Sequence, residues 1–120
     1  MQQASYQMCE KMSGRVIVAH LELADTLWKQ TVGLLGRKSL STDGGMWLDR
    51  CNGIHTFAMQ FPLDVLFLDS SHILVRAVSQ VAPWRICGPV LKARVVVELP
   101  AGTIERQNIQ IGKQYSIVNS

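Results

Sequence analysis

Residues 51–64 hold most of the side chains in this chain that could do chemistry, and they read CNGIHTFAMQFPLD. Cys51, His55 and Met59 recur there at intervals of four, which places them on one face of an extended strand. Thiolate, imidazole and thioether groups are soft ligands that suit copper(I) or a blue-copper centre. However, four residues of strand separate side chains by about 13 Å, and methionine commonly fills a core. We therefore predict that these residues pack in the interior, and we expect no metal and no other cofactor.

The same segment offers an acid–base pair. Asp64 stands within an apolar run, where an ionised carboxylate is costly unless it is paired or hydrogen-bonded. His55 could exchange a proton with it, and Cys51 or Thr56 could act as a nucleophile. The alternative is that Asp64 caps the turn after Pro62 and only fixes the start of the next strand. Both interpretations stay open, and His55 and Asp64 are the catalytic candidates if the protein is an enzyme.

A second segment, Pro83-Trp84-Arg85, presents a flat aromatic ring beside a guanidinium group on a backbone stiffened by proline. Arginine and tryptophan together favour partners that carry a carboxylate, a phosphate or an aromatic ring. Arg37 and Arg50 lie beside two other turns and are candidates for the rim of the same site. The alternative is that Trp84 only covers an open end of the sheet, with Arg85 in solvent.

Composition indicates one globular domain with a weak basic bias. The chain has 120 residues, of which 48% are hydrophobic and 18% charged, and its formal net charge is +3. These values exclude a disordered chain, and so small a charge predicts no direct contact with nucleic acid. The basic charge is local, because residues 70–97 contain four basic side chains and no acidic one. These four are Arg76, Arg85, Lys92 and Arg94.

Cysteine usage and hydropathy predict the compartment. Three cysteines, with no C-x-x-C pair, do not build a disulfide framework, so we expect a reducing, cytoplasmic location. No run reaches 18 apolar residues, so no membrane span is expected. The first 14 residues show no signal-peptide pattern, although a trimmed exported precursor would read the same way. The oligomeric state is left open.

Hydrophobic periodicity predicts a succession of short strands with little helix. Asp25 is a candidate N-cap for a helix over residues 25–35, which Gly36 would end. Strands over residues 46–49 and 54–59 are expected to form a hairpin, and strands 63–69 and 73–81 a second one. Further strands are expected over residues 15–23, 93–99 and 114–118, with a helical turn over 103–107.

These elements predict an α+β domain dominated by its sheet. We expect a curled mixed sheet or a half-open small barrel, with one short helix after the first strand and a helical turn near the C-terminus. Residues 15–120 would form the single domain, and residues 1–14 a flexible N-terminal tail.

Six ordered motifs together resemble the family catalogued as domain of unknown function 192. They are Gly33-Leu34-Leu35-Gly36-Arg37, Gly45-Met46, Ile54-His55-Thr56-Phe57-x-Met59, Pro62-Leu63-Asp64-Val65-x-Phe67-Leu68-Asp69, Pro83-Trp84-Arg85 and Glu98-Leu99-Pro100-Ala101-Gly102. The resemblance covers about residues 15–118. It implies a compact, β-rich α+β domain of bacteria and archaea, and it implies no reaction.

The function we expect first is a non-catalytic binding module. Its ligand would be a small anion or carboxylate, or a peptide from a partner protein. The residues predicted to bind it are Arg37, Arg50, His55, Thr56, Met59, Asp64, Trp84 and Arg85. One alternative is a hydrolase that uses His55 and Asp64. The other is a structural or assembly protein, which would expose an apolar patch and lack a convergent polar pocket.

Overall fold

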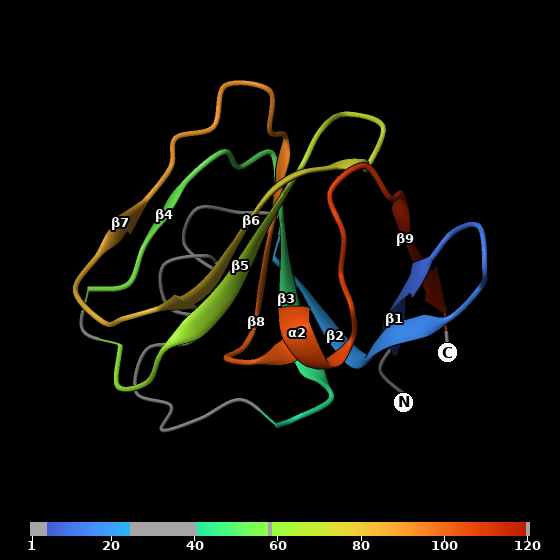
Figure 1. Ribbon diagram of the computed structural model, residues 1–120, viewed down its shortest axis with the longest axis horizontal. Helices are drawn as coiled ribbons and strands as arrows, with labels where there is room; N and C mark the ends of the chain where they lie inside the picture. The colour runs from blue at the N-terminus through green and yellow to red at the C-terminus, as the bar shows by residue number, and fades with distance from the viewer. Residues whose placement is uncertain (1–4, 25–40, 58, 120) are drawn as a thin grey trace.

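The computed structural model describes residues 5–24, 41–57 and 59–119 (Figure 1). Its strands are β1 (Tyr6–Glu10), β2 (Val16–Ala24), β3 (Gly44–Asp49), β4 (Ile54–His55), β5 (Leu63–Leu68), β6 (Leu74–Val81), β7 (Ile86–Cys87), β8 (Val95–Pro100) and β9 (Tyr115–Asn119). The short helix α2 (Thr103–Arg106) follows β8, where a helical turn was expected. The helix predicted over residues 25–35 and the candidate Arg37 lie outside the described residues.

Seven of these strands form one curled sheet in the order β6-β5-β8-β3-β2-β1-β9. The sheet is mixed, because β2 and β3 run parallel while the other neighbouring pairs are antiparallel. Its two edges approach each other at one end, where Ile73 bridges Gln114 and the amide of Leu74 donates to the carbonyl of Lys113 at 2.9 Å. Figure 1 shows the resulting half-open form, which does not close into a barrel. The α+β prediction with a curled sheet is confirmed.

Strand β5 separates two apolar clusters because both of its faces are buried. Leu66 and Leu68 point into the first cluster, which α2 helps to cover through Ile104. Val65 and Phe67 point into the second cluster. A continuous apolar run is what a strand buried on both sides requires, and the predicted hairpin of β5 with β6 is also confirmed.

The hairpin expected between residues 46–49 and 54–59 was wrong. Strand β3 pairs with β2 and β8, whereas β4 pairs with β7 in a separate two-stranded ribbon. The chain leaves β3 toward a different neighbour: the amide of Cys51 donates to the carbonyl of Arg94 at 3.0 Å, and the carbonyl of Asn52 accepts the amide of Val90 at 2.8 Å. These bonds direct residues 51–55 away from β3 and over the second apolar cluster.

The N-terminal segment also differs from the flexible tail that we expected over residues 1–14. Residues 6–10 form β1, which is hydrogen-bonded to β2 on one side and to β9 on the other. Met8 and Cys9 are buried in this strand, and Met8 belongs to the first cluster. Apolar burial and pairing on both sides therefore hold residues 6–10 in the sheet.

Candidate functional site

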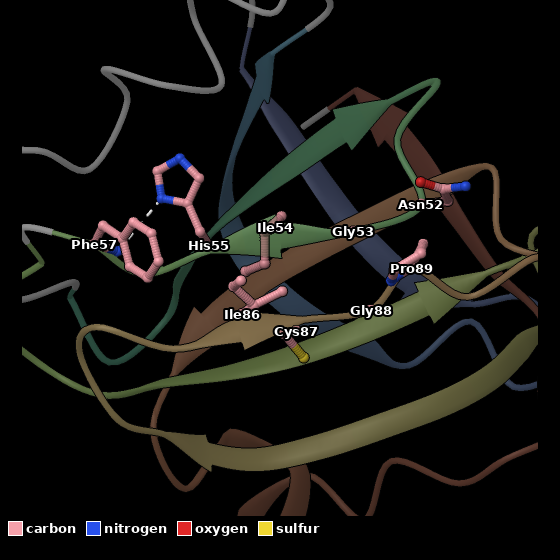
Figure 2. Close-up of a pocket in the computed structure, with 9 residues that line it drawn as sticks. All are labelled: Asn52, Gly53, Ile54, His55, Phe57, Ile86, Cys87, Gly88 and Pro89. Carbon is pink, nitrogen blue, oxygen red and sulfur yellow. Dashed lines mark hydrogen bonds between the residues drawn. The ribbon is translucent and has the colours of Figure 1, made fainter.

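A hollow of about 370 Å³ lies along the β4–β7 ribbon (Figure 2). In the ribbon, Ile54 pairs with Cys87 and His55 pairs with Ile86. Cys87 is buried toward the second apolar cluster, whereas the side chains of His55 and Ile86 are exposed. The lining residues are Asn52, Gly53, Ile54, His55, Phe57, Ile86, Cys87, Gly88 and Pro89. The lining is mostly apolar, and its titratable groups are the His55 imidazole and the Cys87 thiol.

Thr56 joins the ribbon to the loop before β7. Its side chain is fully buried, and its hydroxyl donates to the carbonyl of Ala82 at 2.7 Å while it accepts the amide of Arg85 at 2.9 Å. Its carbonyl accepts the amide of Trp84 at 2.9 Å, and its own amide donates to the carbonyl of Arg85 at 2.8 Å. Thr56 is therefore a structural clamp for the loop, and its hydroxyl is turned away from solvent.

The segments that Thr56 holds together carry an exposed row of rings. Trp84 has a φ of 64°, in the left-handed region, and its side chain is 63% exposed. Its ring stacks on Phe57 with a centroid separation of 5.8 Å, and Phe57 lies 4.9 Å from the ring of His55. The amide of Phe57 also donates to Nδ1 of His55 at 3.3 Å, as Figure 2 shows. We call His55, Phe57 and Trp84 the aromatic row.

Two basic side chains, Arg85 and Arg76, lie near the hollow. Arg85 is exposed next to Trp84, and its Nη1 atom lies 3.5 Å from the Trp84 carbonyl. Arg76 is exposed on β6 and pairs with Phe67 on β5, so the two side chains lie on the same face of the sheet. On that face the Phe67 ring comes close to Gly88, which lines the hollow. The pKa of the Cys87 thiol is raised by burial, and the charge of Arg76 only partly offsets this. Cys87 is therefore not an activated nucleophile.

Cys51 has the same limitation as a nucleophile. Burial raises the pKa of its thiol, and its Sγ atom donates a hydrogen bond of 3.0 Å to the Gly53 carbonyl. The neutral, hydrogen-bonded thiol is favoured, whereas nucleophilic attack requires the thiolate.

Asp64 and His55 lie on opposite faces of the large sheet. Asp64 is fully buried and follows the alternation of Leu66 and Leu68 into the first cluster, whereas the β4–β7 ribbon covers the second. Its Oδ1 atom accepts the amide of Gln80 at 2.8 Å, and its Oδ2 atom accepts the amide of Ile104 at 2.8 Å. The acid–base pair is therefore not formed. Asp64 accepts backbone hydrogen bonds, as its structural interpretation requires, but the donors are the amides of Gln80 and Ile104 and not those of the turn after Pro62.

Two further predicted site residues that the structure describes, Met59 and Arg50, do not join the aromatic row. Met59 is buried in the second cluster, which fits its role as a core side chain. Strand β4 ends at His55, so Cys51, His55 and Met59 do not share one strand face. Arg50 is exposed in the turn after β3, with a φ of 52°. Of the predicted residues that the structure describes, it brings together His55, Thr56, Trp84 and Arg85.

Sequence reasoning missed two members of the site. Phe57 and Ile86 are large apolar residues with exposed fractions of 40% and 72%. In a strand over residues 54–59, Phe57 would share the face of His55 and Met59, which we predicted to pack in the interior, but the structure leaves its side chain exposed. The sequence carried one signal for both: Phe57 follows the predicted binding residue His55 by two positions, and Ile86 follows Trp84 by two. Among the described residues, no group of three or more His, Cys, Asp or Glu side chains could hold a metal ion, and no helix is long and apolar enough to cross a membrane.

The chain belongs to the family catalogued as domain of unknown function 192 (Uncharacterized ACR), whose model matches residues 8–117. A UPF0127 protein of Thermococcus sibiricus is 32% identical over 111 residues, covering 89% of this chain and 71% of that protein. A second UPF0127 protein, from Pyrococcus furiosus, is 30% identical over 115 residues, covering 88% of this chain and 92% of its own length. The resemblance deduced from the six motifs is confirmed.

Two solved structures share the fold. A protein of unknown function from Novosphingobium aromaticivorans superposes with a TM-score of 0.79 at 23% identity, over 93% of this chain and 83% of that one. A putative transcription regulator from Sinorhizobium meliloti superposes with a TM-score of 0.77 at 24% identity, over 94% of this chain and 92% of that one. Likeness at this level of identity shows a common fold only.

Proposed function

We propose that this domain is a non-catalytic binding module whose site is the hollow together with the aromatic row. The backbone of Trp84 carries this proposal. A left-handed conformation costs a bulky residue roughly 1–2 kcal/mol, and an indole that stays in solvent gains little burial in return. Thr56 nevertheless holds this conformation through the hydrogen bonds of its carbonyl and hydroxyl. Local strain that the fold maintains is characteristic of sites that contact a ligand.

The dimensions and charges of the site indicate the class of ligand. A volume of about 370 Å³ is near the lower end of the range for ligand pockets, which runs from about 300 to 1,000 Å³. It suits a small molecule or one peptide side chain with an apolar or aromatic body. Arg85 and Arg76 favour an anionic group on that ligand, and residues 70–97 contain no acid to oppose it. We therefore assign small aromatic or aliphatic carboxylates, free or carried by a peptide.

The assigned compartment is the cytoplasm. Cys9, Cys51 and Cys87 are free thiols, and such thiols persist most readily in a reducing environment.

Titration of the ¹⁵N-labelled protein tests the proposal. Indole-3-acetate and benzoate are added, and their neutral amides serve as matched probes that lack the charge. We expect amide shifts at residues 52–57 and 84–88, with weaker binding of the amides. Trp84→Ala should raise the Kd at least tenfold for both kinds of probe, and Arg85→Ala should weaken the acids selectively. Lys92→Ala is the matched control, because Lys92 is exposed in the same basic segment. Shifts confined to another surface, or equal binding by all variants, would contradict the proposal.

The exposed apolar groups also support a second candidate, an assembly protein. Phe57, Trp84 and Ile86 expose 40%, 63% and 72% of their surface around one site. Such clustering is typical of protein-contact surfaces, where aromatic residues are enriched. The two candidates share a surface and differ in the size of the partner.

A further inference from the structure

The β4–β7 ribbon has an outer strand edge at Ile86. The amide of Thr56 donates to the carbonyl of Arg85 at 2.8 Å, which makes that pair hydrogen-bonded. Antiparallel pairs alternate, so the next pair, His55 with Ile86, is of the type that is not hydrogen-bonded. The N–H and C=O of Ile86 therefore point away from β4. Within the described part of the chain, neither group has a hydrogen-bond partner.

Side chains beside this edge suit an extended partner. The exposed face of the ribbon carries Ile86, 72% exposed, next to His55 of the aromatic row. The hollow continues along the same ribbon to Gly88 and Pro89. A strand laid along β7 would project alternate side chains toward this face, where one of them could fill the hollow.

The charges near the edge specify an acidic partner. Arg85 precedes Ile86 directly, and Arg76 lies on the sheet face that the ribbon covers. The segment 70–97, which contains both arginines and β7, lacks an acid. A second copy of this chain would bring the same basic segment to the contact, and such like-charge contact is unfavourable. Acidic residues on a different polypeptide would be complementary.

We propose that an extended, acidic segment of a partner protein adds to β7 as a third strand of the ribbon. Its main chain pairs with the N–H and C=O of Ile86, its acidic residues face Arg85 and Arg76, and one of its apolar or aromatic side chains enters the hollow. This inference rests on the proposed function, because it uses the same hollow, and it identifies the carrier of the ligand as a peptide main chain.

A peptide with the sequence Glu-Val-Glu-Trp-Glu-Val-Glu, blocked at both ends, is the probe. Two further versions carry N-methyl groups, one on the amides of the acidic positions and the other on those of the apolar positions. Strand addition turns only alternate amides toward β7, so one version should lose at least tenfold in affinity while the other binds like the parent. Affinities are measured by calorimetry and by amide shifts of the labelled protein.

Protein variants provide the complementary measurement. Ile86→Pro removes the N–H that faces outward and leaves the pairing with β4 intact, whereas Ile86→Ala keeps the N–H and shortens the side chain. We expect Ile86→Pro to weaken the peptide at least tenfold more than Ile86→Ala does. Because Ile86 also lines the hollow, both variants should lose some affinity for indole-3-acetate, and the result is the difference between the two variants for the peptide. The methylated peptides act on the unaltered protein, so they decide the question even if Ile86→Pro does not fold.

Three outcomes would overturn the strand addition. Equal binding by both methylated peptides would show that the main chain is not recognised. Binding of indole-3-acetate without binding of the peptide would leave the proposed function standing and exclude the peptide carrier. Sedimentation of the free protein as a dimer that Ile86→Ala or Ile86→Pro dissociates would identify the occupant of the edge as a second copy.

Discussion

The Oδ2 atom of Asp64 accepts a hydrogen bond of 2.8 Å from the amide of Ile104, across 40 residues of sequence. Its other oxygen accepts the amide of Gln80 at 2.8 Å, where Gln80 has a φ of 54° and the register of β6 with β5 shifts. One buried carboxylate thus satisfies an amide at a β-bulge and an amide in the first turn of α2. Asp64 acts in the architecture of the sheet, on the face opposite the hollow.

Asp64→Asn should therefore lower stability and leave the hollow intact. The amide replaces one acceptor oxygen by a donor, which leaves the N–H of Gln80 or Ile104 without its partner. We expect the free energy of unfolding to fall by about 2–3 kcal/mol, as measured by urea denaturation. Asp43→Asn is the control: its exposed side chain lies 3.4 Å from His20, and such surface pairs contribute about 0–1 kcal/mol. Unchanged stability of the Asp64→Asn variant, together with lost carboxylate binding, would instead place Asp64 in the site.

Thr56→Val tests the clamp with little change in shape. Valine keeps the volume and removes the hydroxyl, so the Arg85 amide and the Ala82 carbonyl lose their partner. We expect a loss of about 1–3 kcal/mol in the free energy of unfolding. The tryptophan fluorescence spectrum should also change, because the loop that carries Trp84 is no longer held by the hydroxyl. Thr56→Ser retains the hydroxyl and should keep the spectrum of the parent. If valine and serine variants behave alike, the hydroxyl does not hold the loop.

Trp84→Gly and Trp84→Ala separate the backbone of this residue from its ring. Both variants lose the stack on Phe57, but only glycine adopts a φ of 64° without a steric penalty. We expect the glycine variant to be more stable than the alanine variant by about 1 kcal/mol, the reverse of the usual order in regular structure. Thermal unfolding of the two proteins measures the difference. Greater stability of the alanine variant would show that the left-handed conformation is not required by the fold.

The fold was largely readable from local pattern. The run from Leu63 to Leu68 has apolar residues on both faces, which specifies a strand buried on both sides, and its hairpin with β6 needs only a short turn. Strand β1 was missed because its sequence alternates weakly, and its place depends on Met8 reaching the core between β2 and β9. The pairing of strands that are distant in sequence, such as β4 with β7, cannot be predicted from the residue pattern of either strand.

The sequence predicted the site residues correctly where the residue type alone indicated a role. It failed where the role depended on the position of the residue in the folded sheet. Trp84 and Arg85 stood out because a ring beside a guanidinium group in a proline-bounded loop has little reason to be buried. Asp64 stood out as a costly carboxylate, and that reasoning was sound. Its partners, Gln80 and Ile104, are backbone amides, which no side-chain pattern reveals. The opposite orientation of Asp64 and His55 follows from strand pairing, which was predicted incorrectly for residues 54–59.

A buried carboxyl on β8 gives the protein a specific dependence of stability on pH. Glu98 is 6% exposed and lies between Met46 on β3 and Val65 on β5. Burial raises its pKa from the usual 4.5 to about 7. The folded protein therefore holds a proton on Glu98 between pH 4.5 and pH 7, where the unfolded chain has lost it. Because the folded state binds more protons in this window, the free energy of unfolding falls as the pH rises through it.

Glu98→Gln should remove this part of the pH dependence. Glutamine stays neutral in both states, so the variant avoids the cost of the buried charge, which is fully present above pH 7 and is of the order of 3 kcal/mol. We expect the variant to gain stability relative to the parent protein between about pH 5 and pH 8, as measured by urea denaturation at both values. Titration of histidines contributes equally to both proteins and cancels in the comparison. A difference in stability that is the same at both pH values would show that Glu98 is not held neutral by the fold.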